Sequence, residues 1–119
     1  MPPLARLIAV LIALAPCAAA AQGAIAFNPA TGRYAHDSGA DAARTERDAL
    51  EACGERGCRI VAKATRSKCA ALAKSKDFSS QRGWSVGRGD TSSEAEKEAV
   101  MACQGKFGGY CESPASVCW

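Results

Sequence analysis

The alternation of apolar and polar residues predicts a run of four short elements in the first half of the chain. Residues 23–27 and 33–36 are short strands on either side of a turn with asparagine, proline and glycine. A helical stripe of alanine and leucine covers residues 41–53, and Gly54 stands where a left-handed C-cap ends a helix. Residues 59–65 alternate as a half-buried strand. Alternation predicts that one face of this strand carries Ile60, Ala62 and Ala64, and the other carries Arg59, Val61, Lys63 and Thr65.

The second half predicts the same order of elements. Residues 69–74 favour a strand, although alanine and lysine would also suit a helix there, and residues 83–87 are a further short strand. A capping box at residues 91–94 opens a helix that extends to about Cys103. The inward positions of this helix are expected to be Ala95, Ala99 and Ala102. The strand over residues 110–119 contains Pro114, which marks it as an edge or bulged strand.

The two halves therefore form an internal repeat of strand-strand-helix-strand. Neither half can bury the apolar face of its own helix alone. We therefore expect an α+β fold in which six strands form one antiparallel sheet with both helices packed on one face.

The N-terminal residues have the pattern of a cleaved secretory signal. One basic residue, Arg6, precedes an apolar run over residues 7–15, and small residues follow at 18–21. The run is too short for a membrane-spanning helix, which needs about 20 apolar residues. We predict a signal peptide over residues 1–22, and a single mature domain over residues 23–119, located in the periplasm or secreted. A lipoprotein processed at Cys17 is the disfavoured alternative, because Pro16 directly precedes the cysteine.

Removal of the signal leaves an even number of cysteines, which in a small exported chain predicts a disulfide framework. The core has many alanines, each of which buries little area, so covalent links should add needed stability. The repeated corner between helix and strand favours one pairing. It predicts the disulfides Cys53–Cys58, Cys103–Cys111 and Cys69–Cys118.

The charges of the mature domain are unevenly distributed. Between Arg56 and Arg88 the sequence has nine basic residues and a single acidic one, Asp77, whereas acidic residues concentrate on the two predicted helices. A basic face could bind an anionic protein or envelope component. The simpler explanation is that a thin domain needs charges on its solvent-facing side. The candidate binding face comprises Arg59, Lys63, Arg66, Lys68, Lys74, Trp84 and Arg88.

Candidate catalytic groups are few. The single histidine, His36, precedes Asp37, but adjacent residues of a strand point to opposite faces and would not pair as base and orienting group. The spacing Cys53-x₄-Cys58 nominally fits half of a zinc site, but export to an oxidising compartment favours disulfides. We predict no catalytic residues, no metal site and no cofactor. Nucleic acid is not an expected partner, since no strand pair is rich in aromatic residues.

As an ordered set, several segments resemble the bacterial DUF4189 domain. They are GAIAFNPATGRY (23–34), ALEAC (49–53), CRIV (58–61), CAALA (69–73), GWSVG (83–87) and EAEKEAVMAC (94–103). The resemblance covers essentially the whole mature chain and implies an exported protein whose family has no agreed activity. The lysine-rich middle of the chain departs from the family pattern.

Two functions follow as hypotheses. The first is a non-catalytic binding module, with an inhibitor or immunity-like role, in the bacterial envelope or outside the cell. The alternative is a small hydrolase of envelope polymers that uses His36.

Overall fold

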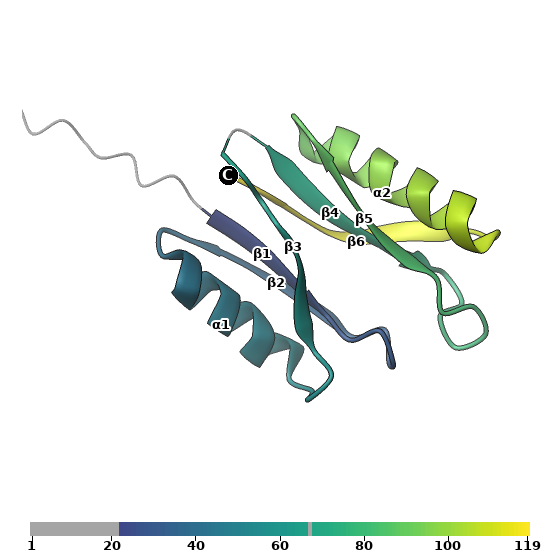
Figure 1. Ribbon diagram of the computed structural model, residues 1–119, viewed down its shortest axis with the longest axis horizontal. Coiled ribbons are helices and arrows are strands. Elements are labelled where there is room, and N and C mark those ends of the chain that lie inside the picture. The colour runs from purple at the N-terminus through teal and green to yellow at the C-terminus, as the bar shows by residue number, and fades with distance from the viewer. Residues whose placement is uncertain (1–21, 67) are drawn as a thin grey trace, which may run out of the picture.

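The computed structural model describes residues 22–66 and 68–119, which form six strands and two helices (Figure 1). The predicted signal peptide and Cys17 lie outside these residues, except that Gln22 begins the first strand. In chain order the elements are β1 (Gln22–Phe27), β2 (Tyr34–Gly39), α1 (Ala42–Cys53), β3 (Arg59–Lys63), β4 (Cys69–Ser75), β5 (Trp84–Gly89), α2 (Ser92–Phe107) and β6 (Cys111–Cys118).

The strands form two sheets, so the prediction of a single six-stranded sheet is wrong. The first sheet has the order β2-β1-β3 and the second has the order β5-β4-β6, and all neighbouring strands are antiparallel. The prediction that both helices pack on one face is also wrong. Figure 1 shows four layers, in which the two sheets face each other, α1 covers the outer side of the first sheet and α2 covers the outer side of the second.

The central strands explain why two facing sheets replace one. In β1, Ala24 and Ala26 pack with α1, whereas Ile25 and Phe27 point the other way and are fully buried. In β4, Ala71 packs with α2 and its neighbours on the opposite face are buried between the sheets. A single sheet with both helices on one side would leave those inner side chains in water. Each sheet is therefore buried by its own helix on the outer face and by the sheet of the other half on the inner face.

A bulge in β3 changes the face that its residues occupy. Ile25 pairs with Ala62 and Ala26 pairs with Ile60, so Val61 is an extra residue in the ladder. As a result Val61 and Ala62 both contact the inter-sheet core, whereas Ile60 packs with the α1 cluster. The strict alternation predicted for this strand is therefore wrong.

The remaining elements agree closely with the sequence pattern. Asp41 and Thr91 cap the two helices, and Gly54 ends α1 in the left-handed region with φ 71°. The segment that could have been helix or strand is the strand β4. Pro114 lies in β6, which is both an edge strand and irregular in its pairing with β4, as predicted. The helix α2 extends one turn past Cys103. Its third buried residue is Cys103, whereas Ala102 had been expected to point inward.

The three disulfides join the pairs that the repeat predicts: Cys53–Cys58, Cys103–Cys111 and Cys69–Cys118. The first ties α1 to the segment before β3, the second ties α2 to β6, and the third links directly opposite residues of β4 and β6. Each disulfide therefore lies within one half of the repeat. The two halves are held together by non-covalent contacts across the inter-sheet core.

Among residues 22–66 and 68–119, no helix combines the length and the apolar character that crossing a membrane requires.

Substitution of Gly87 tests the close packing of α2 on β5. A Cβ at Gly87 would lie 2.6 Å from the carbonyl oxygen of Ala95 and against the backbone of Ala99. We expect Gly87→Ala to lower the free energy of unfolding by about 2 kcal/mol or more in urea denaturation. Gly105→Ala is the matched control, because nothing lies near its added methyl and alanine favours a helix by about 0.5–1 kcal/mol. Equal effects of the two substitutions would contradict this packing.

Removal of the disulfides one at a time tests their relative weight. The sequence separation is 49 residues for Cys69–Cys118, against 5 and 8 for the other two. From loop entropy, replacing Cys69 and Cys118 by alanine should lower the free energy of unfolding by about 4 kcal/mol, and replacing either short-loop pair by about 2–3 kcal/mol. Thermal and urea denaturation of the three double variants measure the order. A larger loss from either short loop would contradict the ranking.

Candidate binding surface beside β3

The two sheets are offset, so that β5 lies outside the area that the first sheet covers. β3 packs over β4, and β1 and β2 pack over β6, whereas β5 makes few contacts with any strand of the facing sheet. In Figure 1, β3 and β5 both run along the side of the molecule nearest the viewer. The place in the first sheet beside β3, above β5, is therefore not filled by a strand among the described residues.

The inner side chains of β5 are consequently less buried than those of β4. Trp84, Val86 and Arg88 are paired with Lys74, Leu72 and Ala70, and so share the inner face of the second sheet. Leu72 and Ala70 are fully buried, but Trp84 and Val86 are half-buried and Arg88 is exposed. Trp84 and Val86, followed by the cation Arg88, therefore remain partly accessible to solvent, although they lie on the face of β5 that is directed toward the first sheet.

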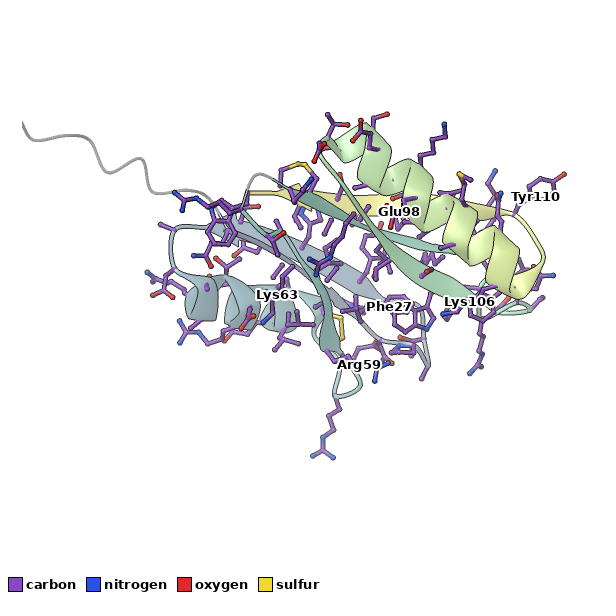
Figure 2. The ribbon with its side chains drawn as sticks, turned by 45° about the horizontal axis from the view of Figure 1, so that its top comes forward. Phe27, Arg59, Lys63, Glu98, Lys106 and Tyr110 are labelled. Atoms are coloured by element: carbon purple, nitrogen blue, oxygen red, sulfur yellow. A yellow bond between two sulfur atoms is a disulfide. The ribbon has the colours of Figure 1, made fainter. Side chains whose placement is uncertain are left out.

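The free edge of β3 forms the other side of this surface. The Arg59 guanidinium lies 5.8 Å from the centre of the Trp84 ring, and Trp84 packs on Phe27 with ring centres 5.1 Å apart. Figure 2 shows Phe27 between the sheets, with Arg59 and Lys63 at the two ends of β3. Val61, which the bulge turns toward the inter-sheet core, lies between those ends. We call this surface the β3–β5 seam; it comprises Arg59, Val61, Lys63, Trp84, Val86 and Arg88.

A hollow of about 280 Å³ opens at the end of the seam where Arg88 lies, and Arg59, Trp84 and Val86 do not line it. Its lining is aliphatic in the middle and cationic at one end, with Thr65 as its neutral polar group. This size suits one or two inserted side chains. The complete lining is Ile60, Val61, Ala62, Lys63, Thr65 and Arg88.

The cations of the seam differ in how they are neutralised. The Lys63 ammonium pairs with Glu46 of α1. Neither Arg59 nor Arg88 has a carboxylate within ion-pair distance among the described residues. The two arginines are therefore the groups whose charge is available to a partner.

The structure brings together four of the seven residues of the predicted binding face: Arg59, Lys63, Trp84 and Arg88. Lys74 is the neighbour of Trp84 on β4, but its ammonium is directed to the β1–β2 turn, where it donates to the carbonyl oxygen of Gly32 at 3.0 Å and lies 5.1 Å from the Tyr34 ring centre. Lys68, before β4, pairs with Asp90, and this hydrogen bond raises the pKa of Lys68. Arg66 is exposed in the same connection.

Sequence reasoning missed Val61 and Val86, the apolar centre of the seam. The predicted alternation placed Val61 on the same face as Arg59, Lys63 and Thr65, Val86 is an apolar residue of an ordinary short strand, and nothing in the sequence signals the offset between the sheets. The bulge that turns Val61 inward also left no mark in the alternation of residues 59–65.

A wider hollow of about 600 Å³ lies between the β1–β2 turn and the end of α1. Its polar groups already hold the turn in place: Glu55 accepts hydrogen bonds from Thr31 at 2.6 Å and Asn28 at 3.3 Å, and Lys74 donates to Gly32. The Glu55 bonds therefore hold the turn within the first half, and the Lys74 bond joins the two halves.

His36 and Asp37 are consecutive residues of β2 and project from opposite faces, as predicted. His36 shares the inner face with Ile25 and is exposed, whereas Asp37 is half-buried. Within residues 22–66 and 68–119, His, Cys, Asp and Glu side chains do not gather in groups of three or more that could hold a metal ion.

Comparison with known proteins gives a family. A family model described as "Domain of unknown function (DUF4189)" matches residues 22–118. No curated protein matches the chain, and no solved structure does. The match spans nearly all of the described residues, including both halves of the repeat and all three disulfides. The chain therefore belongs to the DUF4189 family.

Proposed function

We propose that this protein is an exported, non-catalytic binding module that docks on an anionic partner protein through the β3–β5 seam. An inhibitor or immunity-like role would be of this class. Export, to the periplasm or beyond, is part of the proposal and rests on the N-terminal sequence pattern and on the three disulfides.

The observation that carries the proposal is the accessible inner face of β5. Trp84 and Val86 form an apolar strip that the first sheet leaves open, and Arg59 and Arg88 lie at its two ends. Burying half-exposed tryptophan and valine against a partner is favourable, at about 25 cal/mol for each Å² of apolar area removed from water. Aromatic residues and arginine are also the residues most often found at binding hot spots.

Charge favours an acidic partner. Arg59 and Arg88 lack an ion-pair partner among the described residues, so a partner's carboxylates can meet them without breaking an existing salt bridge. Electrostatic complementarity of this kind raises the association rate and excludes basic partners.

Charge reversal tests the proposal. We expect the oxidised protein to capture an acidic protein from envelope extract, and Arg59→Glu with Arg88→Glu to weaken that capture at least tenfold in titration with the identified partner. Lys97→Glu with Lys106→Glu is the matched control, because these two exposed residues lie on α2 and undergo the same charge change. Capture that both double variants retain, or that both lose equally, would contradict a role for the seam.

The same variants must remain folded for this test to be interpretable. Arg88→Glu should change the free energy of unfolding by no more than about 0.5 kcal/mol, as is usual for exposed positions. Arg59→Glu should lower it by about 0.5–1 kcal/mol, because it removes the contact with the Trp84 ring. Urea denaturation measures both values.

Replacement of His36 tests the non-catalytic part of the proposal. His36→Ala should leave the captured partner and its affinity unchanged, because His36 is on β2 and outside the seam. Assays on peptidoglycan and on peptides should show no turnover with either protein. Turnover by the original protein that His36→Ala abolishes would overturn the proposal in favour of a hydrolase.

A further inference from the structure

The open place beside β3 has the shape of a missing strand. We propose that the partner supplies this strand: an extended acidic segment pairs with the free edge of β3 and lays alternate side chains on the inner face of β5. This inference rests on the proposed function and specifies its partner and geometry. Adding a strand to an exposed sheet edge is a recurrent mode of peptide recognition, in which backbone hydrogen bonds give affinity and side-chain pockets give specificity.

The offset of the sheets defines where the added strand would lie. In the first sheet β3 is an edge strand and packs over β4, so the next position in that sheet falls over β5. The side chains that would lie under it, Trp84 and Val86, are half-buried although they belong to the inter-sheet core. A fourth strand would complete the cover of that core. It needs about five or six residues to run the length of β3, whose five residues span about 17 Å.

The opposite side of the sandwich provides an internal control. By the repeat, β6 corresponds to β3 and β2 corresponds to β5. There the edge of β6 carries Pro114, which has no N–H to donate. The inner side of β2 presents the exposed Tyr34 at the position equivalent to Trp84, but the polar His36 and Ser38 at the positions equivalent to Val86 and Arg88. The equivalent position beside β3 has no proline and presents tryptophan and valine. The two halves thus differ at the place where the proposed strand would bind.

The positive charges of Arg59 and Arg88 favour an acidic partner strand over a second copy of this chain. A second copy of this chain that paired antiparallel through the same edge would bring its Arg59 to the end of the seam where Arg88 lies, and like charges facing each other across strands are destabilising. The bulge and the charges of β3 are devices that protect an edge against such pairing. An acidic strand meets the same arginines favourably. We therefore infer a partner strand with a carboxylate near each arginine.

The order of groups on β5 predicts the sequence of the strand. Trp84 with Arg59 lies at one end, Val86 is in the middle and Arg88 lies at the other end, at successive alternate positions. The inward positions of the added strand should therefore be acidic, apolar and acidic, separated by one outward residue each. The apolar side chain would pack on Val86, next to the hollow that Val61, Ala62 and Arg88 help to line.

Selection from a displayed library of random nine-residue peptides tests this inference. The oxidised protein is the bait, and Arg59→Glu with Arg88→Glu is the counter-selection. We expect enrichment of peptides with the pattern acidic-x-apolar-x-acidic, which the matched control Lys97→Glu with Lys106→Glu still binds. No enrichment, or enrichment of peptides that the counter-selection variant binds equally, would overturn both the inference and the choice of the seam.

Backbone N-methylation of an enriched peptide then distinguishes binding by strand pairing from binding by charge attraction alone. In a strand paired along one edge, every second residue directs its N–H and C=O to the neighbouring strand. N-methylation at those residues should weaken binding at least tenfold, whereas methylation at the intervening residues should change it no more than about twofold. A flat profile in a peptide that still needs Arg59 and Arg88 would overturn strand addition and leave the proposed function standing.

Discussion

The contact between the inner faces of the two sheets is the interaction on which the rest of the structure depends. Ile25 and Phe27 from the first half meet Leu72, Ala115 and Val117 from the second, and all five are buried. No disulfide among the described cysteines joins the halves. Each bond instead stiffens one half, while burial of apolar surface between the sheets holds the two together. The Lys74 ammonium, which reaches from β4 to Gly32, adds a polar tie across the same interface.

The small size of the core residues shapes that interface. Alanine dominates the helix-facing sides of β1 and β4, so the helices can approach the sheets closely, and Gly87 lets α2 rest against the backbone of β5. Larger side chains concentrate at one end of the core, where Phe27 contacts Phe78 and Trp84. That aromatic group lies beside the offset between the sheets. The result is a core that is closed toward β4 and open toward β5, and this opening is the basis of the proposed binding surface.

Much of the fold could be predicted from the sequence, because local signals are strong in a repeat. The cap at Thr91, the glycine stop after α1 and the three disulfide pairs all follow from residue type and spacing. The arrangement of the two halves could not be predicted, since apolar residues on both faces of β1 are compatible with several ways of covering those faces. The sequence identified part of the seam, because its basic residues and its tryptophan stand out by charge and residue type. Val61 and Val86 do not, because their exposure depends on the offset of the sheets and on a bulge.

Amide hydrogen exchange of the free, oxidised protein tests the central claim most directly. If two halves share one core and the place beside β3 is open, the amides of β1 and β4 should exchange slowly and with the same free energy of opening. The outward amides of β3 should exchange far faster than those of either central strand. Separate opening energies for β1 and β4, or strong protection along the outer edge of β3 in the isolated protein, would contradict the account.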